Sequence, residues 1–320
     1  MKKKSMSNKR VITFLAGLLA GHSSWAFQAD FASPPQSGPF SAAFSAGYLQ
    51  GDADEIVYDY ETPDGSRRKL SHLFWDLSDV IMGGGEVGYR VNERWSLNAG
   101  VWLALSEGSG EMDNYDWLDT SSADWTDYSL SDVSVTDGYV IDLNVTYAFY
   151  RRDDANLRLI LGYKQNGWSW EDAGVYALYP EYDYVPLDLG GEIGITYEQE
   201  FRMPYAGISG ELTRGRFGFS GYAVWSPLVS AEDWDHHIER TIYFHGSFEG
   251  GDMLGLGIEA RYALKDNLFL TASVEQQTID LIVGDVDLLD YSTGEYYEGE
   301  DEVGIENSYT VFSLGLGFAF

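Results

Sequence analysis

The sequence predicts an all-β protein, a ten-stranded antiparallel transmembrane β-barrel with long extracellular loops. Three observations lead to this prediction. Apolar and polar residues alternate with a period of two, short and long connections alternate between these segments, and the chain ends on the aromatic residue Phe320. After residue 26 no stretch is long and apolar enough for a membrane helix, so this chain would have to cross a membrane with strands.

The first 26 residues predict a secretory signal peptide, which leaves residues 27–320 as one barrel domain. Five Lys and Arg residues precede the apolar run Val11–Ala20, and Ser24 and Ala26 are the small residues that a signal peptidase requires. An N-terminal membrane anchor is the alternative, but a run of about ten apolar residues is short for a span of roughly 20.

The composition excludes several classes of protein. The chain has no cysteine, which excludes disulfide scaffolds, thiolate metal centres and cysteine nucleophiles. It has 20 Lys and Arg against 51 Asp and Glu, a formal charge of −31. This acidity would repel a phosphate backbone, so nucleic acid is not expected as a partner. With 44% hydrophobic and 15% aromatic residues, the chain has ample apolar surface for a folded core.

Two segments show the strand pattern most clearly. Apolar residues occupy every second position in 95–105 and in 139–149, and aromatic residues stand at the ends of these apolar faces. In a soluble sandwich such a face would be the interior, whereas in an outer-membrane barrel it contacts lipid between two aromatic girdles. Residues 312–320 continue the alternation to the last residue, as expected of a strand that closes a barrel rather than of an exposed edge.

The connections alternate in length, which sets the strand number and the orientation. Short links are predicted at 91–94, 151–156, 213–216 and 265–267, and long acidic ones around 60–68, 117–137, 171–188, 230–240 and 285–306. Four short and five long connections join ten strands. An even strand number places both ends in the periplasm and the long loops outside.

Two groups of polar residues are candidates for chemistry, because P-loop, dinucleotide, nucleophile-elbow and H-E-x-x-H motifs are absent. In extended chain Asp233, Asp235 and His237 point the same way, and an Asp beside a His can fix its tautomer and raise its basicity. Asn114 and Asp116 likewise share a face. Taken alone, each group also fits a solvated acidic loop, and we predict no metal site. A shared site requires a fold that brings the two groups together.

At these motifs the sequence resembles the omptins, outer-membrane endopeptidases built as ten-stranded barrels. Residues 108–117 (GSGEMDNYDW) resemble the family's GSGNMDDYDW, residues 201–207 (FRMPYAG) its FxMPYxG, and residues 233–237 (DWDHH) its DNDEH. The resemblance covers nearly the whole mature chain and implies an outer-membrane location in a Gram-negative bacterium, with the active site facing the exterior.

The resemblance also implies roles for individual residues and no cofactor. Asp235 and His237 match the pair that activates the attacking water, and Asp116 matches one member of an aspartate couple opposite them. Glu55 and Asp233 match the acidic pocket that selects Arg or Lys in peptide or protein substrates. Asn114 departs from the family, which has an aspartate there, and an amide carries no charge and accepts no proton.

A second departure concerns lipopolysaccharide, which omptins bind through basic residues on the barrel wall. The matching positions here are Gly167 and Glu200. Loss of cations and gain of an acid make phosphate binding there less favourable, which argues against a dependence on lipopolysaccharide although the barrel still contacts outer-membrane lipid. Two functions stay open: an endopeptidase that cleaves at basic residues, and a non-proteolytic barrel of the same fold that captures cationic ligands or acts as an adhesin.

Overall fold

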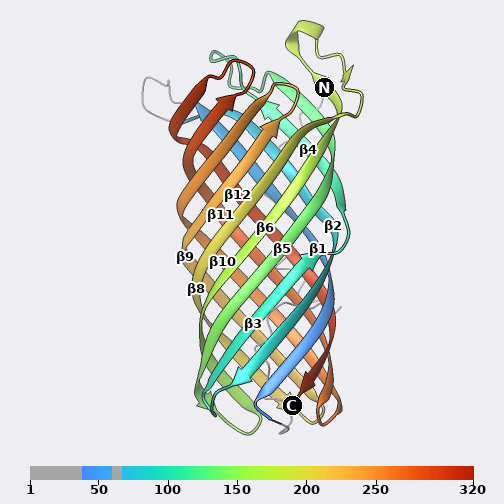
Figure 1. The fold of residues 1–320 in the computed structure, drawn as a ribbon, viewed down its shortest axis with the longest axis vertical. Helices are drawn as coiled ribbons and strands as arrows, with labels where there is room; N and C mark the ends of the chain where they lie inside the picture. The colour runs from blue at the N-terminus through green and yellow to red at the C-terminus, as the bar shows by residue number, and fades with distance from the viewer. Residues whose placement is uncertain (1–37, 60–66) are drawn as a thin grey trace.

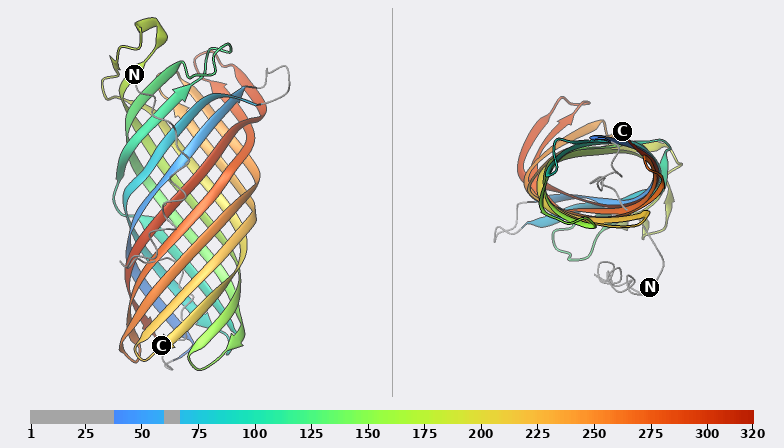
Figure 2. Two further views of the ribbon diagram at one scale, coloured as in Figure 1. Left: turned by 180° about the vertical axis from the view of Figure 1, so that it is seen from behind. Right: turned by 90° about the horizontal axis from the view of Figure 1, so that it is seen from below.

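The computed structural model of the chain describes residues 38–59 and 67–320, and the predicted signal peptide and most of the connection at 60–68 lie outside them. These described residues form a tall, closed barrel with an oval cross-section (Figures 1 and 2). Among them, no helix is long and apolar enough to cross a membrane.

Twelve strands are present in the described residues, and eleven of them occupy ten positions around the wall. Their bounds are β1 Phe40–Asp59, β2 Arg68–Arg90, β3 Trp95–Ala104, β4 Gly108–Asp116, β5 Asp127–Arg151, β6 Ala155–Leu178, β7 Leu187–Asp188, β8 Ile193–Arg214, β9 Phe217–His237, β10 Ile242–Lys265, β11 Leu268–Asp290 and β12 Tyr296–Ala319; a single 3-10 turn, η1, spans Pro180–Tyr182.

The ring closes in the order of the chain. β3 and β4 both lie between β2 and β5, so together they form one wall strand that is interrupted at 105–107, and β7 is a two-residue addition to β6. The first and last strands pair antiparallel from Ser41↔Ala319 to Val57↔Val303. The predicted ten-stranded antiparallel barrel is thereby confirmed, and no strand edge of the wall is left open.

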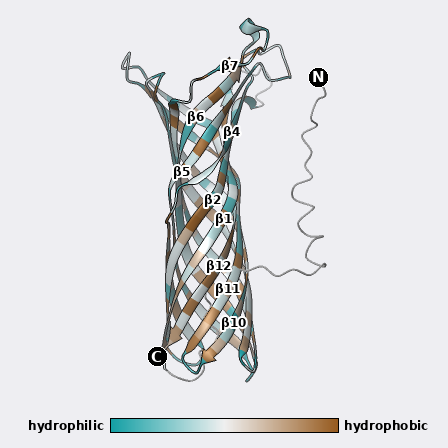
Figure 3. Ribbon diagram, turned by 90° about the vertical axis from the view of Figure 1, so that its right-hand side faces the viewer, coloured by the Kyte–Doolittle hydropathy of each residue, from teal (hydrophilic) through white to brown (hydrophobic). Residues whose placement is uncertain are grey.

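The lower half of the barrel carries the membrane-facing surface (Figure 3). Apolar side chains point outward there and are 44–68% exposed; they include Phe44, Val87, Leu97, Val101, Leu103, Leu143, Leu159, Leu161, Ile208, Phe219, Leu256, Ile258, Leu270 and Leu314. Aromatic pairs such as Phe40 with Tyr89 and Phe217 with Tyr262 lie near the lower turns, where an interfacial girdle belongs.

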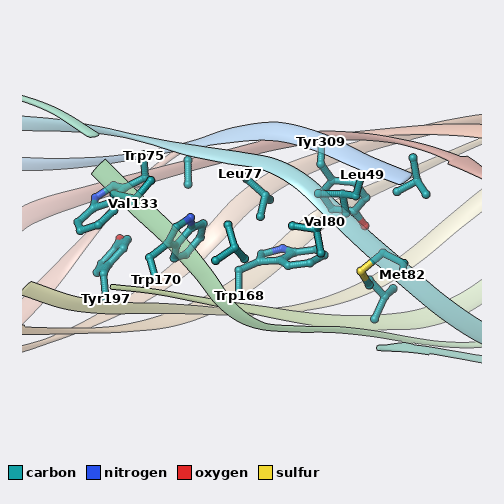
Figure 4. Packing of buried hydrophobic residues seen from close by; sticks show 14 of the residues in the cluster. Leu49, Trp75, Leu77, Val80, Met82, Val133, Trp168, Trp170, Tyr197 and Tyr309 are labelled. Carbon is teal, nitrogen blue, oxygen red and sulfur yellow. The ribbon is translucent and has the colours of Figure 1, made fainter. Parts of the chain in front are cut away.

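Side chains fill the barrel interior. A large apolar cluster crosses the upper part and includes Trp75, Trp168 and Trp170, all buried (Figure 4). Below it lies a buried ion pair between Lys164 on β6 and Glu275 on β11. A ten-stranded barrel is narrow enough for large side chains to close it, so this interior is a packed core.

The strands rise further beyond the apolar band than the sequence indicated. The predicted long connections at 117–137, 230–240 and 285–306 are mostly strand, and so is the first part of the one at 171–188. The outer connections among the described residues are 117–126, 179–192, 238–241 and 291–295. Buried apolar residues such as Val133 and Val135 alternate with the acids in these segments. One face of each segment meets solvent while the other packs inside, so the segments pair as strands.

Candidate active site

The upper mouth of the barrel brings together the polar residues that the sequence singled out, beyond the outward apolar band. On β9, Asp233 and Asp235 face inward and are 5% and 2% exposed. Trp234 and His236 point outward, where Trp234 stacks on His245 of β10 and His236 meets Tyr243 edge-on. The period-two prediction for this segment is therefore confirmed.

His237 makes a polar contact through each ring nitrogen. Its Nε2 lies 2.7 Å from Asp235 Oδ2, and its Nδ1 lies 2.6 Å from Arg240 Nη2. A guanidinium only donates hydrogen bonds, so Nδ1 accepts and the ring proton resides on Nε2, where it is donated to Asp235. The ring is thus held as the tautomer whose Nδ1 lone pair accepts the hydrogen bond from Arg240.

The opposite wall of the mouth is formed by β4 and β2. Asn114 and Asp116 are half-buried and pair in register with Leu73 and Ser71, and the Ser71 hydroxyl donates to Asn114 Oδ1 at 3.0 Å. Asp113 points away and accepts a hydrogen bond from Tyr128 at 2.6 Å. As the alternation predicted, Asn114 and Asp116 share the inner face.

The two walls interact electrostatically across the mouth. Burial raises the pKa of the Asp116 carboxyl, and a hydrogen bond with Ser71 opposes that rise. The positive charges of Arg240 and of a protonated His237 also lower it, so Asp116 lies within electrostatic range of the Asp235–His237 pair. The fold therefore brings the Asn114–Asp116 group and the Asp235–His237 pair to the same mouth, as a shared site requires.

Below this opening lies a cluster of buried acids, Glu55, Asp233 and Asp235. Glu55 on β1 is 5% exposed and lies within electrostatic range of both Asp233 and Asp235. Burial, together with the charges of these two neighbours, raises the pKa of Glu55 well above its usual value. Burial also raises the pKa of Asp233 to about 7, assisted by Asp235 and opposed by hydrogen bonds from Tyr197 and the Gly246 backbone.

Two carboxyl oxygen atoms of this acid cluster have no hydrogen-bond partner among the described residues. They are Glu55 Oε2 and Asp235 Oδ1. Asp233, by contrast, accepts from Tyr197 Oη at 3.1 Å and from the Gly246 amide at 2.9 Å. A buried carboxyl oxygen without a donor is costly, so a ligand that supplied hydrogen-bond donors would satisfy these two atoms.

The acid cluster is packed from below and from the side by residues that the sequence did not single out. Tyr197 stacks on Trp75 with ring centroids 5.0 Å apart and on Trp170 at 5.7 Å, which gives the acid cluster a rigid aromatic floor (Figure 4). At Gly246 of β10, a Cβ atom would overlap Asp233 Oδ1. Only glycine at this position lets the carboxylate lie against the backbone.

Two polar residues of the site were missed from the sequence. Asp172 on β6 is 5% exposed and accepts from Ser131 Oγ at 2.7 Å and from the Gly194 amide at 3.1 Å. Burial raises its pKa, and a protonated His237 lowers it, so Asp172 belongs to the same electrostatic cluster. Arg240 is the other. Neither lies in a recognisable motif, and only the alternation after Trp170 signals that Asp172 points inward.

The positions considered for lipopolysaccharide lie on the outer wall. Glu200 accepts from Tyr139 Oη at 2.7 Å and pairs with Arg202, which also contacts Glu232 at 2.8 Å. The Tyr139 ring covers Gly167 so closely that a Cβ there would overlap it. The cation nearest to Glu200 is thus already paired with acids, and the weakened phosphate binding expected at this wall stays a prediction.

Comparisons with known proteins agree with one another. A sequence profile of the Omptin family matches residues 36–320. The plasminogen activator of Yersinia pestis is 30% identical over 322 residues, which cover 99% of this chain and 100% of that protein. The outer membrane protease OmpP of Escherichia coli K12 is 27% identical over 321 residues, which cover 98% and 100%. The crystal structure of the outer membrane protease OmpT from Escherichia coli shares the fold, with a TM-score of 0.81 and 24% identity over 92% of this chain and 100% of that chain.

Proposed function

Because this chain belongs to the omptin family, we propose that it is an outer-membrane endopeptidase that cleaves peptides or proteins at Arg or Lys residues. Its relatives named as outer membrane proteases support the hydrolase activity. The geometry of the mouth supports the specificity and the mechanism that we propose.

The observation that carries the specificity is the group of buried acids formed by Glu55, Asp233 and Asp235. Two of their oxygens lack a partner among the described residues, and burial makes their charges costly. An Arg or Lys side chain would supply both the missing donors and the compensating charge, in charge-assisted hydrogen bonds. A neutral side chain would leave the acids unpaired, and this difference is the source of selection.

In the proposed mechanism, the nucleophile is a water molecule held between the two walls of the mouth. Its oxygen attacks the scissile carbonyl carbon while His237 Nδ1 takes its proton, and Asp235 stabilises the imidazolium that forms. The same proton then passes to the nitrogen of the scissile amide as its C–N bond breaks, which releases the amine and the carboxylic acid. Asn114 and Asp116 orient the water or the carbonyl by hydrogen bonds, with Ser71 holding them in place.

The orientation of the barrel supports a site that faces the exterior. Phe40 at the start of β1 and Phe320 at the end of the chain lie at the lower end of the barrel, opposite the mouth (Figure 1). In bacterial barrels with an even strand number, both ends of the chain face the periplasm. The mouth would then open to the medium, where polypeptides carrying basic residues reach it without crossing the membrane.

The test compares cleavage of a fluorogenic Arg–Arg peptide by the wild type and by two histidine variants. His237→Ala should lower kcat/KM by about 100-fold or more, the usual effect of losing a general base. His236→Ala is the matched control, because the neighbouring ring points outward and should leave kcat/KM within about twofold. Heat-modifiable migration in detergent gels reports whether each barrel is folded.

The outcomes separate the proposal from its alternative. Undiminished cleavage by folded His237→Ala, or an equal loss in both variants, would remove His237 from the mechanism. A folded wild type that binds Arg–Arg peptides and does not cleave them would favour the non-proteolytic capture barrel instead.

A further inference from the structure

Arg240 donates a hydrogen bond to His237 Nδ1, the ring nitrogen that takes the proton in the proposed reaction. Its Nη2 lies 2.6 Å from His237 Nδ1, while His237 Nε2 is taken by Asp235 at 2.7 Å. A water molecule cannot deliver a proton to a lone pair that already accepts a hydrogen bond from a guanidinium. In the geometry described, His237 is correctly held but unable to act as a base.

The turn between β9 and β10 aims Arg240 at this position. It consists of residues 238–241 and is fastened at both ends: the Ile238 amide donates to Gly194 of β8 at 2.9 Å, and the Thr241 carbonyl accepts from Tyr291 at 2.9 Å. Thr241 adopts a φ of 55°, a region that β-branched residues rarely enter. A strained residue that its surroundings hold in place is a common feature of functional sites.

The guanidinium lies at the surface of the mouth. Arg240 is solvent-exposed, so the hydrogen bond to His237 competes with water and is modest in strength. The neighbouring charge that Arg240 influences is Asp116 on the opposite wall, whose pKa it lowers. Arg240 therefore interacts with both walls of the mouth, with His237 on one and with Asp116 on the other.

We propose that Arg240 is a built-in cap on the site: it holds the Nδ1 lone pair of His237 in the resting protein and turns aside when a substrate chain enters. This inference rests on the proposed function. No bond forms or breaks in the capping step, since one donor on Nδ1, the guanidinium, is exchanged for another, the attacking water. Once water occupies that position, its proton passes to Nδ1 as its oxygen attacks the carbonyl carbon.

The cap has a kinetic signature that distinguishes it from a structural role. Displacement of Arg240 belongs to the step in which free enzyme and substrate combine, so it raises KM and leaves kcat unchanged. In Arg240→Ala we expect kcat/KM for an Arg peptide to rise about three- to tenfold through a lower KM, as for the loss of one exposed hydrogen bond. Glu239→Ala, next to it in the same turn, is the matched control and should leave both constants unchanged.

A second measurement requires no cleavage. Diethyl pyrocarbonate modifies a ring nitrogen whose lone pair is free, so the cap should protect His237 in the folded, detergent-solubilised protein. In a His236→Gln background, which removes the adjacent ring, Arg240→Ala should speed modification of His237 by about three- to tenfold, by the same loss of one hydrogen bond. His245, whose ring lies 4.0 Å from Asp287 and away from Arg240, is the internal standard and should react at an unchanged rate.

The two measurements fail in different ways. Faster modification of His237 in Arg240→Ala supports the cap, whether or not any variant cleaves the peptide. If no variant cleaves it, only the proposed protease function is contradicted. Unchanged modification overturns the cap whatever the kinetics. Faster modification accompanied by a loss of cleavage would also overturn it, because Arg240 would then assist turnover.

Discussion

The proposed preference for Arg over a neutral residue should depend on pH, because a carboxyl group attracts a cation only when it is ionised. Asp233 has a pKa of about 7, so it is half ionised at neutral pH, about 1% ionised at pH 5 and almost fully ionised at pH 9. Lowering the pH through 7 protonates Asp233 and removes the charge that attracts the guanidinium. The preference for Arg should therefore approach its full value near pH 9 and decline steadily as the pH falls through 7 to 5.

The assay compares two peptides that differ only at the selected residue, one with Arg and one with citrulline, its uncharged isostere. Protonation of His237 affects both peptides equally, so the ratio of their kcat/KM values isolates the acid cluster. Between pH 7 and pH 5 this ratio should fall about 5- to 25-fold, because the ionised fraction of Asp233 falls from about a half to about 1% while the protonated carboxyl group keeps about 1–10% of the selectivity.

Asp233→Asn supplies the control. At pH 9 it should lower the Arg-to-citrulline ratio by about 10- to 100-fold, since a charge-assisted hydrogen bond is worth about 1.5–3 kcal/mol. In Asp233→Asn the Arg-to-citrulline ratio should also begin to fall at a lower pH than in the wild type, because Glu55 loses a charged neighbour that raises its pKa. A wild-type ratio that stays constant from pH 5 to 9 would refute the assignment of these acids to substrate selection.

Three further substitutions test other parts of the structure. Asn114→Asp should raise kcat severalfold, because a carboxylate near the water would stabilise the imidazolium as it forms; equal or lower kcat from pH 5 to 9 would leave Asn114 a positioning residue. Gly246→Ala should reduce the Arg preference without unfolding the barrel, since its methyl group displaces the Asp233 carboxylate, and an unchanged Arg-to-citrulline ratio would contradict that contact. Lys164→Met should destabilise the barrel by about 3–5 kcal/mol by leaving Glu275 buried without its partner, whereas adding Glu275→Gln to Lys164→Met should recover much of this loss in urea unfolding.

The period of two in the sequence was sufficient to predict which residues share a face. It placed Asp233, Asp235 and His237 on one side of a strand, and Asn114 with Asp116 on one side of another, because successive side chains of any strand point to opposite faces. The alternation of apolar residues and the regular connection lengths likewise determined the barrel and its ten strands, since these are local properties that do not depend on register.

The same local patterns misplaced the upper ends of the strands. Acid-rich segments were predicted as loops, yet residues such as Val133 pack inside and keep the backbone in the wall. Composition reports how polar a segment is, whereas strand pairing depends on whether its other face finds a partner, and that is a tertiary property.

Only the tertiary structure decided how the separate faces combine into a site. Registers between strands far apart in the chain bring Glu55 of β1 beside Asp233 of β9 and set Asp172 of β6 near His237. They also determine burial, which raises the pKa values of these acids, and the strained turn that directs Arg240 onto His237. The sequence alone does not show these contacts. The distances between these residues and their desolvation, which control their chemistry, exist only once the barrel has closed.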